Sequence, residues 1–239
     1  MQQVIESFTN PVDHLALDEA LLLAAEAGEV GETIRVWELK SPAVVIGRST
    51  KVEFEVDRSF CEGNQIPVLR RCSGGATIVA GAGCLMYSVI IDVDANPELR
   101  KIDAAHAHVM SRVLAVAKQQ LPETQLQGVC DLTWQNRKFS GNSLRISRSC
   151  LLYHGTVLYA ADLELLSQCL RQAPRQPEYR QQRDHGEFVT NAPIDPQLFK
   201  SGLLSAFQVT DSPLVDLPDA RMAELVSGRY GNDAWNFRH

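Results

Sequence analysis

The segment 70–75 has the residue types of a loop that binds an anion. It reads Arg-Arg-Cys-Ser-Gly-Gly and follows a short apolar run that ends at Leu69. Arginine side chains donate paired hydrogen bonds to phosphate or carboxylate groups, and glycines let backbone N–H groups approach a ligand closely. A surface turn with two solvated arginines is the alternative, because short glycine-containing motifs often occur without function.

Asp131 and Lys138 form a second pair of residues that could act on charged groups. A strand, a turn near 136–137 and a second strand would bring the two side chains together. The carboxylate could hold Mg²⁺, and the lysine could neutralise charge that develops on a phosphate or carboxylate. The alternative is a hairpin with an exposed lysine, which is the commoner arrangement in proteins.

His154 stands in a Tyr-His-Gly-Thr sequence on an apolar stretch, where a histidine is either a catalyst or a hydrogen-bonded core residue. The sequence contains no Gly-x-Ser-x-Gly elbow, so a serine hydrolase is not indicated. It also contains neither Gly-x-Gly-x-x-Gly nor Gly-x-x-x-x-Gly-Lys-Ser/Thr, which are the two common nucleotide-binding loops.

The elements expected around these residues alternate irregularly between helix and strand. Asn10 is a good N-cap and Pro11 a good first helical residue, so a helix is predicted over 11–28. A second long helix is predicted over 98–121, where apolar residues recur at helical spacing. The predicted strands are 33–39, 43–46, 66–69, 77–79, 85–92, 126–134, 138–146 and 150–159, and shorter helices begin near Asp162, Asp195 and Pro218. Strand pairs this close together argue against a regular βαβ alternation and predict an α+β fold with a mixed sheet.

The length and composition fit one large domain with a small appendage. The chain has 239 residues, 45% of them hydrophobic and 22% charged, which is ordinary for a globular protein. The most plausible domain edge falls near Pro193, which gives 1–193 as the catalytic domain and 194–239 as a small C-terminal helical appendage. The polar segment 173–191 is predicted to be an ordered surface loop.

Charge and hydropathy argue against two classes of partner. The net charge of −6 and the pI near 5.5 argue against a nucleic-acid-binding protein. No apolar stretch approaches the about 20 residues of a membrane helix, and the N-terminus lacks the features of a signal peptide. The six cysteines contain no Cys-x-x-Cys pair, so they indicate reduced thiols, and a cytoplasmic location is expected.

The order and spacing of these motifs carry more information than any one of them. Along the chain stand Asn-Pro at 10–11, Leu-Asp-Glu-Ala-Leu at 17–21, Val-Val-Ile-Gly-Arg at 44–48, Arg-Arg-x-Ser-Gly-Gly at 70–75, Asp-Leu at 131–132, Lys-Phe-Ser-Gly-Asn at 138–142 and His-Gly-Thr at 154–156. This succession, which covers roughly residues 10–170, resembles the lipoate–protein ligase A and octanoyltransferase family, a group related to the biotin protein ligases. The resemblance implies a mixed β-sheet flanked by helices, of the class II synthetase or biotin-synthetase type.

The family attaches lipoyl or octanoyl groups to a lysine of a carrier domain. By resemblance, the protein would be a lipoate–protein ligase-like enzyme that uses ATP and Mg²⁺ to activate lipoate or octanoate as an acyl-adenylate. Its carriers would be lipoyl domains of 2-oxoacid dehydrogenase E2 subunits or the glycine cleavage H protein. Lys138 matches the family's essential lysine and would neutralise the acyl carboxylate and the α-phosphate, then the carbonyl oxygen during transfer.

Further positions match the binding residues of the family. Trp37 would line the acyl tunnel, and Asp131 would lie near the phosphate and hold Mg²⁺. The full set implied for acyl and adenylate binding is Trp37, Arg71, Ser73, Gly74, Gly75, Ala76, Ile78, Asp131, Arg145 and His154. The chain departs from many ligases at Ala76, in place of a third glycine, at 80–81, in place of His-Asp, and at Met86, in place of Asn. The lost histidine removes one donor, so acyl binding is more strongly predicted than adenylate binding.

Two alternatives to a ligase stay open. An octanoyl or lipoyl transferase would take the acyl group from a carrier thioester, with Cys130 as a candidate nucleophile; a buried, inert thiol is the competing interpretation of this residue. The second alternative is a non-catalytic protein that binds acyl groups or carrier domains. Only about 45 residues follow Pro193, too few for the accessory domain of full-length ligases, so a ligase of this length could need a separate accessory protein.

Overall fold

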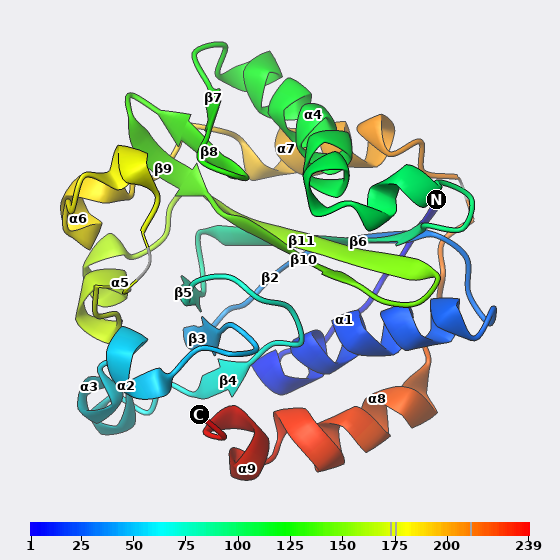
Figure 1. The fold of residues 1–239 in the computed structure, drawn as a ribbon, viewed down its shortest axis with the longest axis horizontal. Helices are drawn as coiled ribbons and strands as arrows, with labels where there is room; N and C mark the ends of the chain where they lie inside the picture. Colours follow the sequence, from blue (N-terminus) through cyan, green and yellow to red (C-terminus); the bar gives the residue numbers. More distant parts are fainter. Residues whose placement is uncertain (173, 175, 211) are drawn as a thin grey trace.

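A five-stranded mixed sheet forms the centre of the molecule (Figure 1). The computed structural model describes all residues except 173, 175 and 211. The strand order of the central sheet is β1 (Gln2–Gln3), β2 (Thr33–Glu38), β6 (Cys84–Asp92), β11 (Cys150–Leu158) and β10 (Asn142–Ile146). β1 runs parallel to β2, and the other neighbouring strands are antiparallel. Nearly every residue of β6 and β11 is buried, because both faces of the sheet are covered.

Two three-stranded sheets flank the central one. The first joins β4 (Val68–Arg70), β3 (Ala43–Ile46) and β5 (Ile78–Ala80), and the second joins β7 (Gln125–Gln127), β8 (Asp131–Trp134) and β9 (Arg137–Ser140). In Figure 1 the β3–β5 sheet lies below the central sheet and the β7–β9 sheet lies above it. All four residues of β3 are buried, as its continuous Ala-Val-Val-Ile run predicts for a strand covered on both sides.

Helices cover both faces of the central sheet. α1 (Pro11–Glu26) begins as predicted, with the side chain of Asn10 as its N-cap. α1 lies below the sheet with α8 (Asp219–Leu225), whereas α4 (Ile102–Gln120) and α7 (Pro196–Ala206) lie above it (Figure 1). The predicted α+β fold, a mixed sheet flanked by helices, is therefore confirmed.

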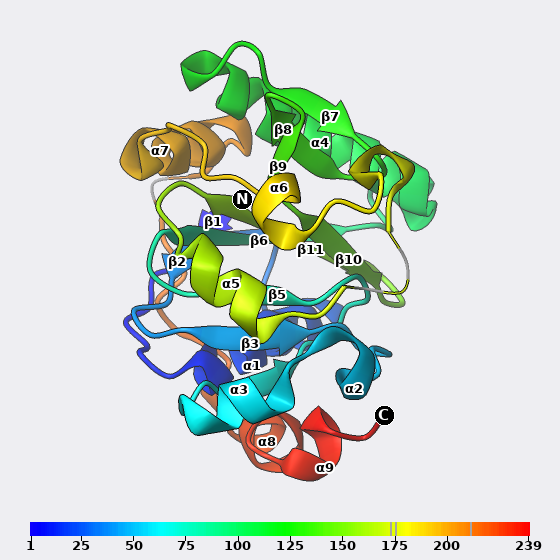
Figure 2. The ribbon, with the colours of Figure 1, turned by 90° about the vertical axis from the view of Figure 1, so that its left-hand side faces the viewer.

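Shorter helical segments surround the smaller sheets. They are α2 (Val52–Glu55), α3 (Arg58–Gly63), α5 (Leu163–Cys169), α6 (His185–Phe188) and α9 (Asp233–Asn236), with the turns η1 (Pro97–Arg100), η2 (Glu178–Arg180) and η3 (Val226–Tyr230). Figure 2 shows α5 and α6 in front of the sheets, with α2 and α3 below them. Among the described residues, no helix combines the length and the apolar character that a membrane crossing requires.

Two predicted strands are each broken by a glycine. The predicted strand 126–134 turns at Gly128, which has a φ of 59°, and becomes β7 and β8. The predicted strand 138–146 divides at Gly141 into β9 and β10, which belong to different sheets. A Cβ atom on Gly141 would lie 2.8 Å from both Cε and Nζ of Lys138, so the glycine makes room for the lysine side chain.

The segment 173–191 is more than the predicted surface loop. It contains η2 and α6, and the side chains of Arg180 and Phe188 are buried with the guanidinium 4.7 Å from the ring centroid. Residues 194–239 pack in two places: α7 against α4, and α8 with α9 against α1 and β4. The domain edge near Pro193 stays a prediction.

Candidate active site

Lys138 lies on β9 where two cavities meet. Its Nζ is 2.8 Å from Oδ1 of Asp131, and the hydroxyl of Tyr179 donates to Oδ2 of the same carboxylate at 2.7 Å. The turn between β8 and β9 has positive φ at Gln135 and Asn136, which is typical of a tight hairpin. The predicted hairpin therefore does bring Asp131 and Lys138 together, and the lysine side chain keeps 27% of its surface exposed.

The first of the two cavities, here the Trp37 cavity, has mainly apolar walls. These walls are formed by Leu15, Trp37, Val45, Ile78 and Met86, and its open volume is about 580 Å³. The indole of Trp37 stacks on the ring of His14, with 4.2 Å between centroids and 5° between planes. A cavity with walls of this apolar character suits an apolar ligand.

The second, here the Phe188 cavity, combines apolar walls with basic groups. Its apolar residues are Leu158, Leu166, Leu170, Phe188 and Val189, its basic residues are Lys138, Arg171, Arg180 and His185, and its open volume is about 690 Å³. The two cavities share the residues Ala76, Thr77, Ile78, Lys138, Gly141 and Thr156. A ligand in one cavity and a ligand in the other would therefore both reach Lys138.

Arg71 binds mainly to its own loop. Its guanidinium donates to Oγ of Ser73 at 3.0 Å and to the carbonyls of Val45 at 3.1 Å and Ala76 at 2.9 Å. It also donates to the carbonyl of Gly74, which accepts a second hydrogen bond from Ser143. Burial lowers the pKa of Arg71 to about 10. The side chain lines the Trp37 cavity, but it holds the loop closed with the donors that an anion would use.

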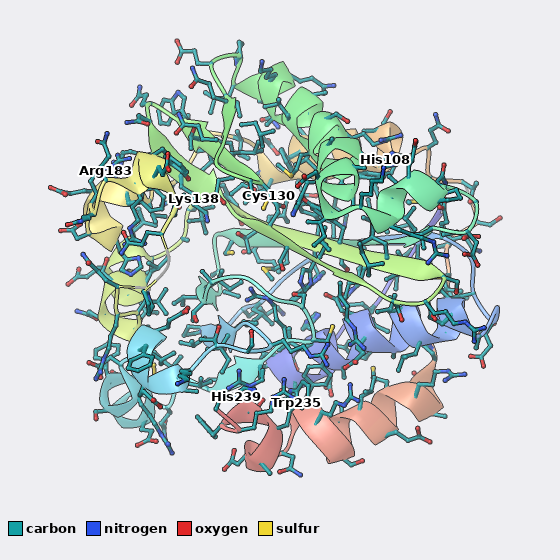
Figure 3. All side chains as sticks on the ribbon, viewed as in Figure 1. His108, Cys130, Lys138, Arg183, Trp235 and His239 are labelled. Atoms are coloured by element: carbon teal, nitrogen blue, oxygen red, sulfur yellow. The ribbon has the colours of Figure 1, made fainter. Side chains whose placement is uncertain are left out.

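Arg70 does not belong to either cavity. Its buried guanidinium donates to the carbonyls of Gly47 at 2.9 Å, Thr50 at 2.8 Å and Asn236 at 2.9 Å. Successive side chains of a strand point to opposite faces, so Arg70 points away from the face that Arg71 occupies. Trp235, which is labelled in Figure 3, donates its indole N–H to the carbonyl of Arg70 at 2.9 Å. The prediction that both arginines bind an anion is wrong for Arg70.

Ser73, His154 and Asp18 form a hydrogen-bonded chain. Oγ of Ser73 is 2.5 Å from Nε2 of His154, and Nδ1 of His154 is 3.1 Å from Oδ2 of Asp18. Arg35 and Ser88 donate to the other oxygen of Asp18, each at 2.7 Å. Burial raises the pKa of Asp18, but the charge of Arg35 and the hydrogen bonds from His154 and Ser88 outweigh it, so this pKa falls to about 2.

This chain orients the residues around the cavity rather than supplying a serine nucleophile. Asp18 can only accept and Arg71 can only donate, so the proton of a neutral His154 lies on Nδ1 and the hydroxyl of Ser73 donates to Nε2. Ser73 is 1% exposed and does not line the Trp37 cavity, whereas Asp18 and His154 do. Sequence reasoning assigned no role to Asp18, although an acidic residue within an apolar helix was a usable signal.

Several predicted site residues lie outside both cavities. Arg145 forms an ion pair with Glu19, a fully buried carboxylate that also accepts from Arg229 and Tyr230. Neither of the two cavities is lined by Asp131, Cys130, Ser73, Gly74, Gly75 or Arg145, whereas Trp37, Arg71, Ala76, Ile78, Lys138 and His154 line at least one. The roles assigned to these residues by resemblance stay predictions.

Cys130 is buried beside β10. Its thiol donates to the carbonyl of Asn142 at 3.1 Å, and the amide of Asn142 donates back to the carbonyl of Cys130. Burial and the charge of Asp131 raise the pKa of this thiol to about 11. A thiol that is inaccessible and protonated at neutral pH is a poor nucleophile, which favours the interpretation of Cys130 as an inert core residue.

Known proteins resemble this chain along nearly its whole length. The family model described as lipoyl protein ligase A/B catalytic domain matches residues 10–201. Lipoate–protein ligase 1 of Staphylococcus aureus is 24% identical over 97% of this chain and 71% of the relative. Octanoyltransferase LipM of Halalkalibacterium halodurans is 24% identical over 96% of this chain and 95% of the relative.

Solved structures share the fold. A lipoate–protein ligase A bound with ATP superimposes with a TM-score of 0.76 at 20% identity, covering 99% of this chain and 98% of the other. A bi-partite lipoate protein ligase of Thermoplasma acidophilum, described with its E2 lipoyl domain, gives a TM-score of 0.76 at 20% identity over 98% and 94%. These matches confirm the resemblance predicted from the motifs, and both ligases and octanoyltransferases are represented. The chain belongs to the lipoyl protein ligase A/B catalytic domain family of acyl-attaching enzymes.

Proposed function

We propose that the protein transfers a lipoyl or octanoyl group to a lysine of a carrier domain. The observation that carries this proposal is the position of Lys138 between an apolar cavity and a basic one. An acyl chain in the Trp37 cavity would end with its carbonyl at the ammonium of Lys138. The activating group would then extend into the Phe188 cavity, where basic side chains offset its negative charge.

The ligase reaction, in which ATP supplies an adenylate, is the first form of this function. Arg180 lines the Phe188 cavity, and its Nη2 is a buried donor that has no partner among the described residues. A phosphate in the cavity would supply the missing acceptor. The ATP-bound lipoate–protein ligase with the same fold supports ATP as the activating substrate. The histidine that this chain lacks at 80–81 would thus be replaced by basic groups of the segment 171–185.

Magnesium fits Asp131 poorly in this arrangement. One carboxylate oxygen of Asp131 faces Lys138 and the other accepts from Tyr179, so a cation would have to displace one of them. The described part of the chain also contains no group of three or more His, Cys, Asp or Glu residues placed to hold a metal ion. We therefore assign Asp131 to the positioning of Lys138 rather than to a metal ion.

Transfer from a thioester is the second form, and one observation favours it. An octanoyltransferase relative is as similar to the chain as the ligase relative, at 24% identity in both cases. Lys138 could stabilise the carbonyl oxygen equally well in this reaction. Cys130 is not assigned as the nucleophile, because it is buried and its pKa is raised to about 11.

The carrier would be a lipoyl domain of an E2 subunit or the glycine cleavage H protein. The E2 lipoyl domain described with the Thermoplasma ligase supports the first of these. For the ligase form, we retain a separate accessory protein as a proposed partner. We place the reaction in the cytoplasm, and we retain 1–193 as the catalytic unit and 194–239 as its appendage.

The test offers purified protein and apo carrier domain two acyl sources, lipoate with ATP or octanoyl-carrier thioester, and detects modification by intact mass. Modification with either source supports the proposal and identifies the form of the reaction. Lipoate binding by calorimetry without modification from either source would instead identify the non-catalytic binder.

A further inference from the structure

We propose that Glu55 receives the ammonium of the acceptor lysine and takes its proton before the amine attacks the acyl group. The inference rests on the proposed function and adds the residue that prepares the nucleophile. Glu55 is the last residue of α2, and no motif in the sequence analysis included it.

Glu55 lies on the path from the surface to Lys138. A third hollow, here the Phe54 cleft, has an open volume of about 970 Å³ and is lined by Lys51, Phe54 and Gly75, among others. Glu55 and Ala76 line both the Phe54 cleft and the Phe188 cavity, and Ala76 also lines the Trp37 cavity. A lysine side chain that enters through the Phe54 cleft would therefore pass Glu55 before it reaches the carbonyl at Lys138.

The charges along this path would repel a lysine if Glu55 were absent. The other charged or basic residues that line the Phe54 cleft and the Phe188 cavity are Lys51, Lys138, Arg171, Arg180 and His185. Among the residues that the structure describes, Glu55 is the one carboxylate in these two linings. It therefore supplies the charge that draws a cationic amine into an otherwise basic site.

One oxygen of Glu55 is available for the amine. Oε2 accepts from the backbone N–H of Thr77 at 3.0 Å and from its hydroxyl at 2.7 Å. Among the described residues, Oε1 accepts no hydrogen bond and Glu55 has no cation within 4.0 Å. A purely structural role in holding Thr77 would not require a carboxylate that also lines an open cleft between basic residues.

The step balances in protons and electrons. The ammonium gives one proton to the Glu55 carboxylate, which passes it to solvent, and the free amine attacks the acyl carbonyl carbon to form the C–N bond. The C–O bond to the adenylate phosphate, or the C–S bond of a thioester, then breaks and the leaving group keeps its electron pair. The nitrogen loses its second proton to the leaving group or to water as the amide forms.

The test compares two nucleophiles on the full-length Glu55→Gln variant. The first is the lysine of apo lipoyl domain, and the second is hydroxylamine, which is uncharged at neutral pH and requires neither a counter-charge nor a base. We expect transfer to lysine to fall about 100-fold or more, as for the loss of a general base. Hydroxamate formation, above its uncatalysed background, should stay at the wild-type level.

Two control variants separate this role from a structural one. Glu53→Gln changes an exposed carboxylate on the same helix and should leave both reactions unchanged. Glu62→Gln changes an exposed carboxylate of α3 outside the three hollows and should likewise retain transfer to lysine.

Three results would overturn the inference. They are wild-type transfer to lysine by Glu55→Gln, an equal loss of both reactions in that variant, and a loss of lysine transfer in Glu53→Gln or Glu62→Gln as large as that in Glu55→Gln. A wild-type protein that forms neither product with either acyl source would instead refute the proposed function, and the inference with it.

Discussion

The two cavities that meet at Lys138 differ in how their polar groups are satisfied. Around the Trp37 cavity, Asp18 has hydrogen-bond partners on both oxygens, and His154 has them on both ring nitrogens. In the Phe188 cavity, Nη2 of Arg180 has no partner within the described chain, and Glu55 keeps one oxygen unbonded. Asp18 and His154 beside the Trp37 cavity are therefore paired, whereas the indole N–H of Trp37 has no partner among the described residues. The Phe188 cavity differs because its charged residues Arg180 and Glu55 each keep an atom that makes no hydrogen bond within the described chain.

This difference explains which part of a substrate each cavity suits. The paired charges of Asp18 and His154 gain little from a polar ligand, so we expect the Trp37 cavity to bind an acyl chain mainly through apolar contact, with the indole N–H of Trp37 as its unpaired donor among the described residues. The guanidinium of Arg180 donates from Nε to the carbonyl of Arg183 but keeps Nη2 without a partner in the described chain, and such a donor gains a charge-assisted hydrogen bond from a phosphate. An acyl chain therefore fits the first cavity and an ionic activating group the second, with the reacting carbonyl between them.

The largest expected effect tests the residue at which the two cavities meet. Lys138→Ala should lower acyl transfer by about 1000-fold, because it removes the positive charge that stabilises the carbonyl oxygen. Lysine modification of a carrier domain, followed by mass spectrometry, measures the loss. Lys118→Ala on the exposed side of α4 is the control and should transfer normally. Transfer by Lys138→Ala at the control rate would show that Lys138 has no catalytic role.

The second-largest expected effect concerns the hydrogen-bonded network of Asp18 beside the Trp37 cavity. Asp18→Asn removes the charge that faces Arg35, whose side chain is 1% exposed. Loss of one partner from a buried ion pair costs about 3–5 kcal/mol, which corresponds to about 2–4 °C of Tm for each kcal/mol in a chain of this size. Thermal unfolding of the variant measures this. Asp103→Asn, exposed in the first turn of α4, should lower Tm by much less, and an equal change in both variants would contradict the buried network.

Acid should weaken the same network by a smaller amount. The pKa of Asp18 is about 2 in the folded protein against 3.8 ordinarily, so its contribution is complete above pH 4 and is lost as the pH falls through 2. The shift corresponds to about 2 kcal/mol of unfolding free energy. Denaturant unfolding between pH 7 and pH 2 measures it, and the Asp18→Asn variant should lack this part of the dependence. An identical pH profile in the variant would refute the assignment.

The site could be predicted from the sequence where it is built locally. Asp131 and Lys138 are joined by one hairpin, so their pairing follows from strand and turn signals alone. The cap of α1 at Asn10 is equally local. The breaks at Gly128 and Gly141 were missed, because a glycine inside an apolar run does not reveal which strand will be the partner on either side.

The rest depends on contacts between residues far apart in the chain. Arg70 and Arg71 are adjacent in the sequence and have the same side chain. Their roles differ because the carbonyl of Asn236, near the C-terminus, accepts hydrogen bonds from the guanidinium of Arg70. Arg145 could not be assigned to Glu19, which lies 126 residues away. The segment 173–191 reads as polar, yet Arg180 packs over Phe188 inside it, because long side chains bury their stems and stack on aromatic rings.

The smallest expected effect concerns Cys130, which lies beside the β8–β9 hairpin but outside both cavities. Its thiol has one hydrogen bond, to the carbonyl of Asn142, so Cys130→Ala should cost about 1 kcal/mol of stability and leave transfer from either acyl source close to normal. Cys84→Ala, another buried cysteine, is the matched control. The decisive measurement is the rate of transfer from octanoyl-carrier thioester, because only this donor needs a nucleophilic thiol in the mechanism that uses Cys130. Loss of thioester-dependent transfer in Cys130→Ala but not in Cys84→Ala would contradict this expectation. The thiol of Cys130 would then have to become accessible and ionised during the reaction, and the two cavities at Lys138 would not by themselves account for the chemistry.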